Sequence, residues 1–551
     1  MKDIAFESAT LAHETDSKLD QITPRIGQSE LLLKSWKLME HLKKLAITGQ
    51  FDQIEQQIRQ TLSEGASPEE RSRIADMAMR IHRFELALEV LHPIVFPEHS
   101  KAPAGSEEQR VIYILALTGL GSTRAAHALL DTLAFEKYPI ALRIRGTLYR
   151  KTWAFERALP WLEKAENQAA PGSIEWLVSR KERLLALLLS DGPSALWDQL
   201  YAEIPDTYLL PEPLIFECRF IAALADIMRT RHTDARSKLL LLQKEILPGT
   251  FGSIGLLIEN LCCSLPDQNN QSPHPTELKL PKTQDPRLTH PDYFRIAEYI
   301  LAKQGNDHQR LLQLYVGSPY FGLKKKLLPI LLENGPLPDL FEWPSRQNPS
   351  GIEPLWTHDL RTGDFRGISA AIAPGTLNSR ILRSLLSDLY RPRHLLEFHS
   401  EVYPREIFSP TSSPLKIHQA LFRLRTWCKK QGIGLSARIE EGLVILDLPE
   451  NASFHLPIET PYIDSNQGVL GAFAVAAAPT QLGFDLISLG RHVGDAPFSA
   501  AEVESHFGVS RRTANRFIKD LLEAQWLIRS AKGKNTTYKW SEPALKLIGL
   551  G

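Results

Sequence analysis

The sequence predicts a mostly α-helical protein in which a long array of paired helices precedes two smaller modules that mix helices and strands. Three observations support this fold class. From Leu31 to about Leu332, apolar residues recur at helical spacing, and few runs alternate as strands do. After Pro354, short strand-like runs appear between helical segments. Near the end, Phe498–Trp540 combines two helical patterns with two β-rich runs around a basic turn.

The composition is that of an ordinary globular protein, and its charge is balanced. A chain of 551 residues is longer than one hydrophobic core organises, so we expect three or more domains. The hydrophobic content of 43% and the charged content of 23% are typical of soluble proteins. Because 64 Lys and Arg residues balance 64 Asp and Glu residues, any attraction to a polyanion must come from a local cluster of charge.

The sequence shows neither a secretion signal nor a membrane span. Residues 1–30 are polar and are expected to be loose, and they lack a basic stretch followed by an apolar one. The most apolar window, Val469–Ala478, is too short to cross a bilayer. The four cysteines have neither metal-binding nor disulfide spacing (Cys218, Cys262, Cys263 and Cys428). We therefore expect a cytoplasmic protein without a membrane partner, a metal or a cofactor.

The helical region contains an internal repeat. Its clearest unit begins at Leu142, and the small residues Gly146 and Ala158 lie twelve positions apart. Small residues are needed where the two helices of a hairpin touch, while large residues such as Tyr149 and Leu162 fill the space between them. Two weaker copies keep the same spacing between their small residues: Ala75 and Ala87, and Ala223 and Ala235.

This pattern resembles the tetratricopeptide repeat, although Arg145 stands where an apolar residue is usual. The resemblance covers residues 31–335, with a loop rich in Pro, Asn and Gln at 265–290. It implies an α-solenoid in which neighbouring hairpins bury the faces that a single hairpin cannot bury. Such arrays usually bind a protein or a peptide, and we expect such a partner here. A purely structural or dimerising array is the alternative.

Residues 352–450 follow a second pattern. Short strands should come first, and helices are expected at Leu377–Tyr390, Arg393–Glu401 and Pro414–Lys430. A hairpin should follow at Ile433–Leu448.

This order, together with the stretches Leu395–Pro404 and Ala420–Cys428, resembles the winged-helix output domain of OmpR-type response regulators. The resemblance implies that the third helix reaches DNA through Lys416, Gln419, Arg423 and Lys429, with Thr426 and Lys430 nearby. Glu440 and Glu441 stand in the expected wing, where basic residues are usual, and acids there repel phosphate. The alternative is that this module binds a protein, or the preceding array.

Residues 451–480 are expected to form a connector, and residues 481–551 a last module. Ser499 and Glu502 have the spacing of a capping box at the start of a helix that ends at Phe507. Gly508 permits a sharp turn, and Ser510 can cap a second helix. Between Phe498 and Trp540 there are eight Lys and Arg residues and four Asp and Glu residues. The local charge is therefore positive although that of the chain is zero.

Helix, turn, basic helix and basic hairpin resemble the winged helices of bacterial transcription regulators. The resemblance implies that the second helix enters the major groove and that the hairpin contacts phosphates. The residues expected on the second helix are Ser510, Arg511, Arg512, Thr513, Asn515, Arg516 and Lys519, and those on the hairpin are Lys532, Lys534 and Lys539. The fold class is then a TPR-like α-solenoid followed by two winged-helix (α+β) domains.

Two functions fit these features. The first is a non-enzymatic transcription regulator that binds double-stranded DNA, with a protein or peptide on its repeats and a possible homodimer. The second is an adaptor whose winged helices contact proteins. Arg511, Arg512 and Arg516 together favour DNA, because docking to a protein does not require three arginines on one helix. The sequence has no phosphate-binding lysine loop, no His-Glu-x-x-His and no nucleophile elbow.

Overall fold

The structure is a computed structural model of the 551-residue chain. The residues that it describes lie between 51 and 547, with gaps at 64, 81–82, 98–102, 135–137, 191, 205–211, 246–251, 266–290, 345–353, 361, 374–375, 404–405, 407, 441, 450–451, 459–485, 508–509, 524 and 531–535. The loose N-terminus, nearly all of the loop at 265–290, most of the connector and the turn with Lys532 and Lys534 therefore fall outside the described residues.

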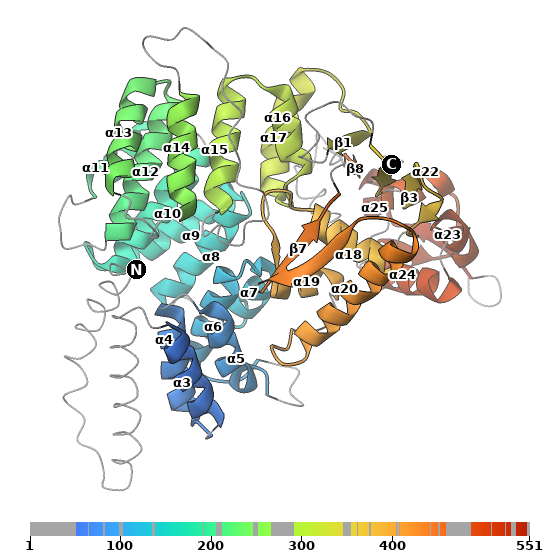
Figure 1. The fold of residues 1–551 in the computed structure, drawn as a ribbon, viewed down its shortest axis with the longest axis horizontal. Helices are drawn as coiled ribbons and strands as arrows, with labels where there is room; N and C mark the ends of the chain where they lie inside the picture. Colours follow the sequence, from blue (N-terminus) through green and yellow to red (C-terminus); the bar gives the residue numbers. More distant parts are fainter. Residues whose placement is uncertain are drawn as a thin grey trace. The chain divides into compact units, whose positions relative to one another are not determined.

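The described residues form two compact units. The first holds the helices up to α14 and α15 as far as Ile300, and the second holds the elements that follow. Helices dominate, and the small sheets all belong to the second unit (Figure 1). The expectation of a mostly helical protein with strands towards its end is confirmed at this level.

The helices of the first unit are short and follow one another closely. Their bounds are α3 Phe51–Ser63, α4 Pro68–Arg80, α5 Phe84–Val95, α6 Glu107–Gly119, α7 Thr123–Leu130, α8 Pro139–Lys151, α9 Phe155–Gln168, α10 Ile174–Ser190, α11 Ala195–Ala202, α12 Glu212–Met228, α13 His232–Glu245, α14 Gly252–Ser264 and α15 Pro291–Gln304.

These helices pack as hairpins. Contacts join α4 to α5, α6 to α7, α8 to α9, and α12 to α13, and further contacts join α4, α6, α8, α10 and α12 in series. Gly146 on α8 shows why the small positions are needed, because a Cβ there would lie 2.5 Å from Cγ of Leu162 on α9. Ala158 and Leu162 are fully buried in the same hairpin. The spacing of twelve residues thus places a small residue where two helix axes approach closely.

Buried charges in this unit are paired. Arg145, which interrupts the apolar pattern, lies 2.6 Å from Asp131. On α8 and α10, Arg150 Nε donates to Glu182 at 2.5 Å. Burial alone would raise the pKa of Glu182, but Arg150 and the neighbouring Lys181 lower it to about 2. The arginines at 145 and 150 therefore lie inside the array because acidic partners offset the cost of their desolvation.

The second unit begins with two helices and a set of short strands. The bounds are α16 His308–Val316, α17 Phe321–Glu333, β1 Leu340–Pro344, β2 Trp356–Asp359, β3 Asp364–Arg366, β4 Ala370–Ala371, α18 Leu377–Leu386, β5 Arg393–His394, α19 Leu395–Val402, α20 Ser413–Lys430, β6 Ser436–Glu440, β7 Leu443–Asp447 and β8 Ala452–Pro457.

Two sheets hold these strands. One has the order β1-β8-β2-β3-β4, in which β8 pairs antiparallel with β1 and parallel with β2. The other has the order β5-β7-β6. β1 precedes the expected module at 352–450, and β8, which pairs with β1 and β2, lies among residues that we expected to belong to a connector. The parallel pairing of β2 with β8 joins segments almost a hundred residues apart, which local periodicity does not reveal.

The last elements form a small module around a compact core. They are α22 Leu486–Val493, β9 Phe498–Ser499, α23 Ala500–Phe507, α24 Arg511–Glu523, β10 Leu527–Arg529, β11 Thr537–Trp540 and α25 Glu542–Leu547. The strands pair in the order β10-β11-β9. Phe498, Phe517 and Trp540 are buried together between the sheet and the helices.

Candidate nucleic-acid interface

Helix α24 has one buried side and one exposed, cationic side. Its buried residues are Ala514, Phe517, Ile518 and Leu521. The residues that reach solvent are Ser510 just before the helix, Arg511, Arg512, Asn515, Arg516 and Lys519. Apolar residues at helical spacing hold the inner side in the core, so the intervening polar residues share the outer side. The side chain of Thr513 lies outside the described part.

Helix α23 and the strands hold α24 in place. The backbone N–H of Ser499 donates to Glu502 Oε2 at 2.6 Å, which is one of the two hydrogen bonds of the predicted capping box at the start of α23. The rings of Phe507 on α23 and Phe517 on α24 meet edge to face with their centroids 5.8 Å apart. The position of α24 is thus set by buried aromatic contacts.

The hairpin is anchored at its base. Leu527 pairs with Trp540, and Tyr538 pairs with Phe498 of β9. Lys539 and Arg529 are exposed on paired strands. Of the three lysines predicted on the hairpin, Lys539 is the one that the structure describes.

The cations on α24 are available to a ligand. Arg511 lies 3.4 Å from Glu504, but both side chains are largely exposed, so this pair contributes little. Among the residues that the structure describes, no acidic side chain pairs with Arg512 or Arg516. Arg512 and Arg516, for which the described residues provide no acidic partner, suit an anionic ligand better than a structural role.

Helix α20 also has a buried and an exposed side. Its buried residues are Ser413, Ile417, Ala420, Leu421, Leu424 and Cys428. The predicted residues Lys416, Gln419, Arg423 and Lys429 are all exposed, together with Thr426 and Lys430. Lys416 is paired with Glu406 at 2.6 Å.

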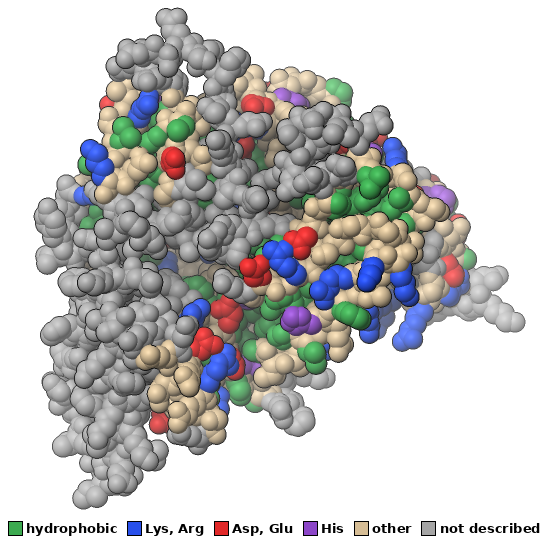
Figure 2. Space-filling view, viewed as in Figure 1, with side chains coloured by type: hydrophobic (Ala, Val, Ile, Leu, Met, Phe, Trp, Pro, Cys, Tyr) green, Lys and Arg blue, Asp and Glu red, His purple; other side chains and the backbone are tan. Residues whose placement is uncertain are grey.

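Two apolar residues share the exposed side of α20, and the sequence pattern did not single them out. Leu415 and Phe422 are each 62% exposed. Phe422 lines a shallow concavity of about 430 Å³ together with His418, Gln419, Arg423 and Arg425. Figure 2 shows Lys and Arg side chains with apolar side chains among them on this part of the surface. This mixture distinguishes α20 from α24.

The β6–β7 hairpin beside α20 does not present a net positive charge. Arg438 on β6 pairs with Asp447 on β7 and also with Glu440 at 3.1 Å. The hairpin thus has acids around its arginine, as the sequence led us to expect from Glu440.

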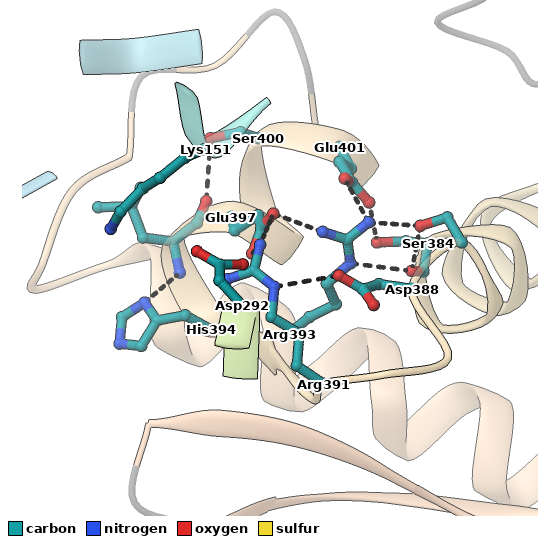
Figure 3. Close-up of polar contacts among 12 residues, drawn as sticks. Lys151, Asp292, Ser384, Asp388, Arg391, Arg393, His394, Glu397, Ser400 and Glu401 are labelled. Atoms are coloured by element: carbon teal, nitrogen blue, oxygen red, sulfur yellow. Dashed lines mark hydrogen bonds and ion pairs between the residues drawn. The ribbon is translucent and has the colours of Figure 1, made fainter. Parts of the chain in front are cut away.

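A buried ion-pair network joins β5 and α19 to the segment that follows α18. Arg393 is 1% exposed and pairs with Glu397 and, at 3.1 Å, with Glu401 (Figure 3). Arg391 lies 2.8 Å from Glu397 and 3.1 Å from Asp388. Our sequence reasoning did not single out this network, although the spacing of four residues from Arg393 to Glu397 and again to Glu401 was a signal for it. All of its charges are paired, so its role is structural.

Other kinds of site find little support in the described parts of the chain. There, no three His, Cys, Asp or Glu side chains are placed to share a metal ion. The same parts contain no helix with both the length and the apolar character needed to cross a bilayer. Burial raises the pKa of the Cys218 thiol to about 12 and that of Cys428 to about 11, which disfavours the reactive thiolates.

Comparisons with protein-family models, with curated proteins and with solved structures find no match for this chain.

Proposed function

We propose that this protein binds double-stranded DNA through α24 and acts as a transcription regulator. The observation that carries the proposal is the outer side of α24, where Arg512 and Arg516, which no described acidic side chain pairs, accompany Asn515 on a helix fixed by its core. Arg pairs bidentately with guanine and Asn with adenine in the major groove, and the same arginines can contact phosphates. Arg and Asn side chains, which can both read base edges, on the exposed side of one helix support sequence-specific binding.

The order of elements in the last module supports this proposal. A short strand, α23, α24 and a two-stranded hairpin is the arrangement of a winged helix, in which the second helix enters the major groove. Lys539 and Arg529 on the hairpin are exposed and suit the phosphate backbone. We expect Lys532 and Lys534 in the turn of the hairpin to contact phosphates as well. Recognition of a two-fold site by a homodimer remains a prediction.

For the first unit we propose a TPR-like solenoid that binds a protein or peptide. Contacts between paired helices, repeated along the chain, support the solenoid. Polar groups of α10 and α12 are paired within the chain and are less available to a partner. Lys181 pairs with Glu217, and the hydroxyl of Tyr293 on α15 donates to Glu217. Exposed Leu240 and Leu241 on α13 provide a further apolar surface for a partner.

The first strand-and-helix module has the order of an OmpR-type winged helix, with α18, α19 and α20 followed by the β6–β7 hairpin. We do not extend the DNA proposal to α20, because Leu415 and Phe422 occupy its exposed side and acids surround the arginine of its hairpin. Contact of Lys416, Gln419, Arg423 and Lys429 with DNA stays a prediction.

The proposal is tested by substituting Arg512 or Arg516 with Ala. Each change should weaken binding of the full chain to a fluorescent duplex by about tenfold, because one charged contact of about 1.4 kcal/mol is lost. Fluorescence anisotropy measures this affinity. The matched control is Lys303→Ala, which removes an exposed cation from α15 and should leave the affinity unchanged. Equal losses in the control and the two arginine variants would refute a site on α24.

The alternative function is an adaptor whose last module contacts a protein. In that case Arg512→Ala and Arg516→Ala would leave the affinity for duplex DNA at the level of the control.

A further inference from the structure

We propose that the exposed side of α20 is a docking site for an acidic amphipathic helix of a partner protein. The site, called the α20 surface below, consists of Leu415, His418, Gln419, Phe422, Arg423 and Arg425. This inference is independent of the proposal for α24, because it concerns another helix and another class of ligand.

The apolar residues form the centre line of this surface. Leu415 and Phe422 are seven residues apart, which is two helical turns, so they point the same way about 10 Å from each other. Each is 62% exposed, so neither is covered by the described chain. Two large exposed side chains in line on one helix are typical of an interaction surface.

Cations flank this apolar line on both sides. At 100° per residue, Arg425 falls on one side of the line through Leu415 and Phe422, and Arg423 falls on the other, beside Lys416, which already pairs with Glu406. A helix with an apolar stripe between two acidic borders matches this arrangement in polarity and in charge. Its apolar residues would cover Phe422 and Leu415, and its carboxylates would face the cations on either side.

The shape of the surface also suits a side chain from such a helix. Phe422 and its neighbours line the concavity of about 430 Å³, which is open to solvent. A Leu or Phe of the partner can bury apolar area against the Phe422 ring there, while Arg423 and Arg425 remain available for carboxylates.

Duplex DNA fits this helix less well. The centre of a groove-reading helix has to offer donors and acceptors to base edges, and the thymine methyl is the apolar group that the major groove displays. Leu415 and Phe422 offer neither donor nor acceptor, and the neighbouring hairpin holds Glu440 and Asp447 around Arg438. On the described part of α24, by contrast, the outward side chains are all polar.

The test uses the full chain and a displayed peptide library as the probe. The peptides are about fifteen residues long, or four helical turns, with Leu or Phe at helical spacing, Asp or Glu beside them, and the other positions random. Selected peptides should bind the wild-type chain and lose at least tenfold in affinity for Phe422→Ser or Leu415→Ser. Arg423→Ala should weaken binding and reduce its dependence on salt. Failure to enrich any binder would overturn the proposal.

Two controls separate this site from other surfaces. Leu355→Ser removes an apolar residue that is 66% exposed elsewhere in the same unit, and should leave peptide affinity unchanged. Arg516→Ala should also leave it unchanged, since α24 is not part of the α20 surface. If Phe422→Ser instead weakened duplex binding and spared peptide binding, α20 would be a DNA-contacting helix. If it abolished self-association measured by sedimentation, the occupant would be a second copy of this chain. Either result would overturn the proposal.

Discussion

At the scale of single residues, the contribution of a charged side chain to stability depends on whether that side chain is buried. Arg393 is enclosed by Glu397, Glu401 and the Ser387 hydroxyl, whereas Arg438 pairs with two acids at the surface. A buried ion pair whose partner is removed leaves an uncompensated charge in a poorly solvated place, while water replaces a partner at the surface. Arginines of the same chemical type should therefore respond very differently to substitution.

Arg393→Met should lower the free energy of unfolding of the second unit by about 3 to 5 kcal/mol, because Glu401 loses its guanidinium partner and Glu397 keeps only Arg391. The side chain of Glu401 is 36% exposed, so its burial is partial; this partial burial raises its pKa, and the loss of Arg393 would raise it further. Urea denaturation followed by circular dichroism measures the change. The matched control Arg438→Met should cost about 1 kcal/mol or less. Similar costs for the two variants would contradict a structural role for the buried network.

A buried histidine makes the second unit sensitive to acid. His358 on β2 is 1% exposed and stacks on Phe365 with ring centroids 4.1 Å apart. Burial lowers the pKa of His358 from 6.5 to about 4. Above pH 6.5 the ring is neutral in both the folded and the unfolded chain, so the stability is unaffected there. Between pH 6.5 and 4 the unfolded chain binds a proton that the folded chain does not, so the stability falls as the pH falls.

The loss should reach about 3 kcal/mol near pH 4, at 1.36 kcal/mol for each unit by which the pKa is lowered. His358→Gln, which retains a donor for the carbonyl of Asp364, should show a smaller decline over the same range. Thermal melting of both proteins between pH 7.5 and 4.5 measures this difference, because that range spans the ordinary pKa of 6.5 and stays above the lowered one. Parallel declines in the two proteins would show that another group is responsible.

At the scale of elements, packing between helices depends on the small positions of the repeat. Gly146→Ala should cost about 1 to 3 kcal/mol, because the new Cβ would overlap the side chain of Leu162 on the facing helix. Leu162→Ala should itself cost about 2 to 5 kcal/mol by leaving a cavity. The double variant should cost less than the sum, because the added methyl partly fills that cavity. Additive costs in urea denaturation would show that these two positions are not in contact.

Helices and strands differ in how well the sequence predicts them. Helix α20 was expected at Pro414–Lys430 and occupies Ser413–Lys430, and α24 follows Ser510 as the capping pattern predicted. These predictions worked because apolar spacing and caps act within a few residues. The pairing of β8 with β1 and β2 was missed, since it depends on distant segments. The exposure of Phe422 was also missed, because an aromatic residue on a helix is usually buried.

For the candidate site, the sequence was sufficient to place the exposed residues of α24 on one side. The same periodicity that buries Phe517 and Leu521 leaves Arg512, Asn515 and Arg516 outward. It could not decide whether those arginines would be paired, because ion pairs such as that of Arg511 with Glu504 join different helices.

At the scale of the whole molecule, positive charge on α24 exists within a chain whose formal net charge is zero. A neutral protein has no general attraction for a polyanion, so its affinity for DNA must come from local cations. Such binding releases counterions from the duplex and therefore weakens as salt rises, in proportion to the phosphates that are neutralised. The slope of this salt dependence thus indicates how many phosphates the protein neutralises.

The central claim is tested most directly by the salt dependence of duplex binding by the full chain, compared with the double variant Arg512→Ala/Arg516→Ala. Anisotropy titrations between about 50 and 200 mM salt give the slope of log affinity against log salt concentration. We expect a steep negative slope for the wild-type chain. The double variant should bind more weakly at every salt concentration. If both arginines contact phosphates, its slope should also be shallower by about two. A wild-type affinity that ignores salt, or a double variant that binds the duplex as tightly as the wild-type chain at every salt concentration, would contradict recognition of DNA by α24.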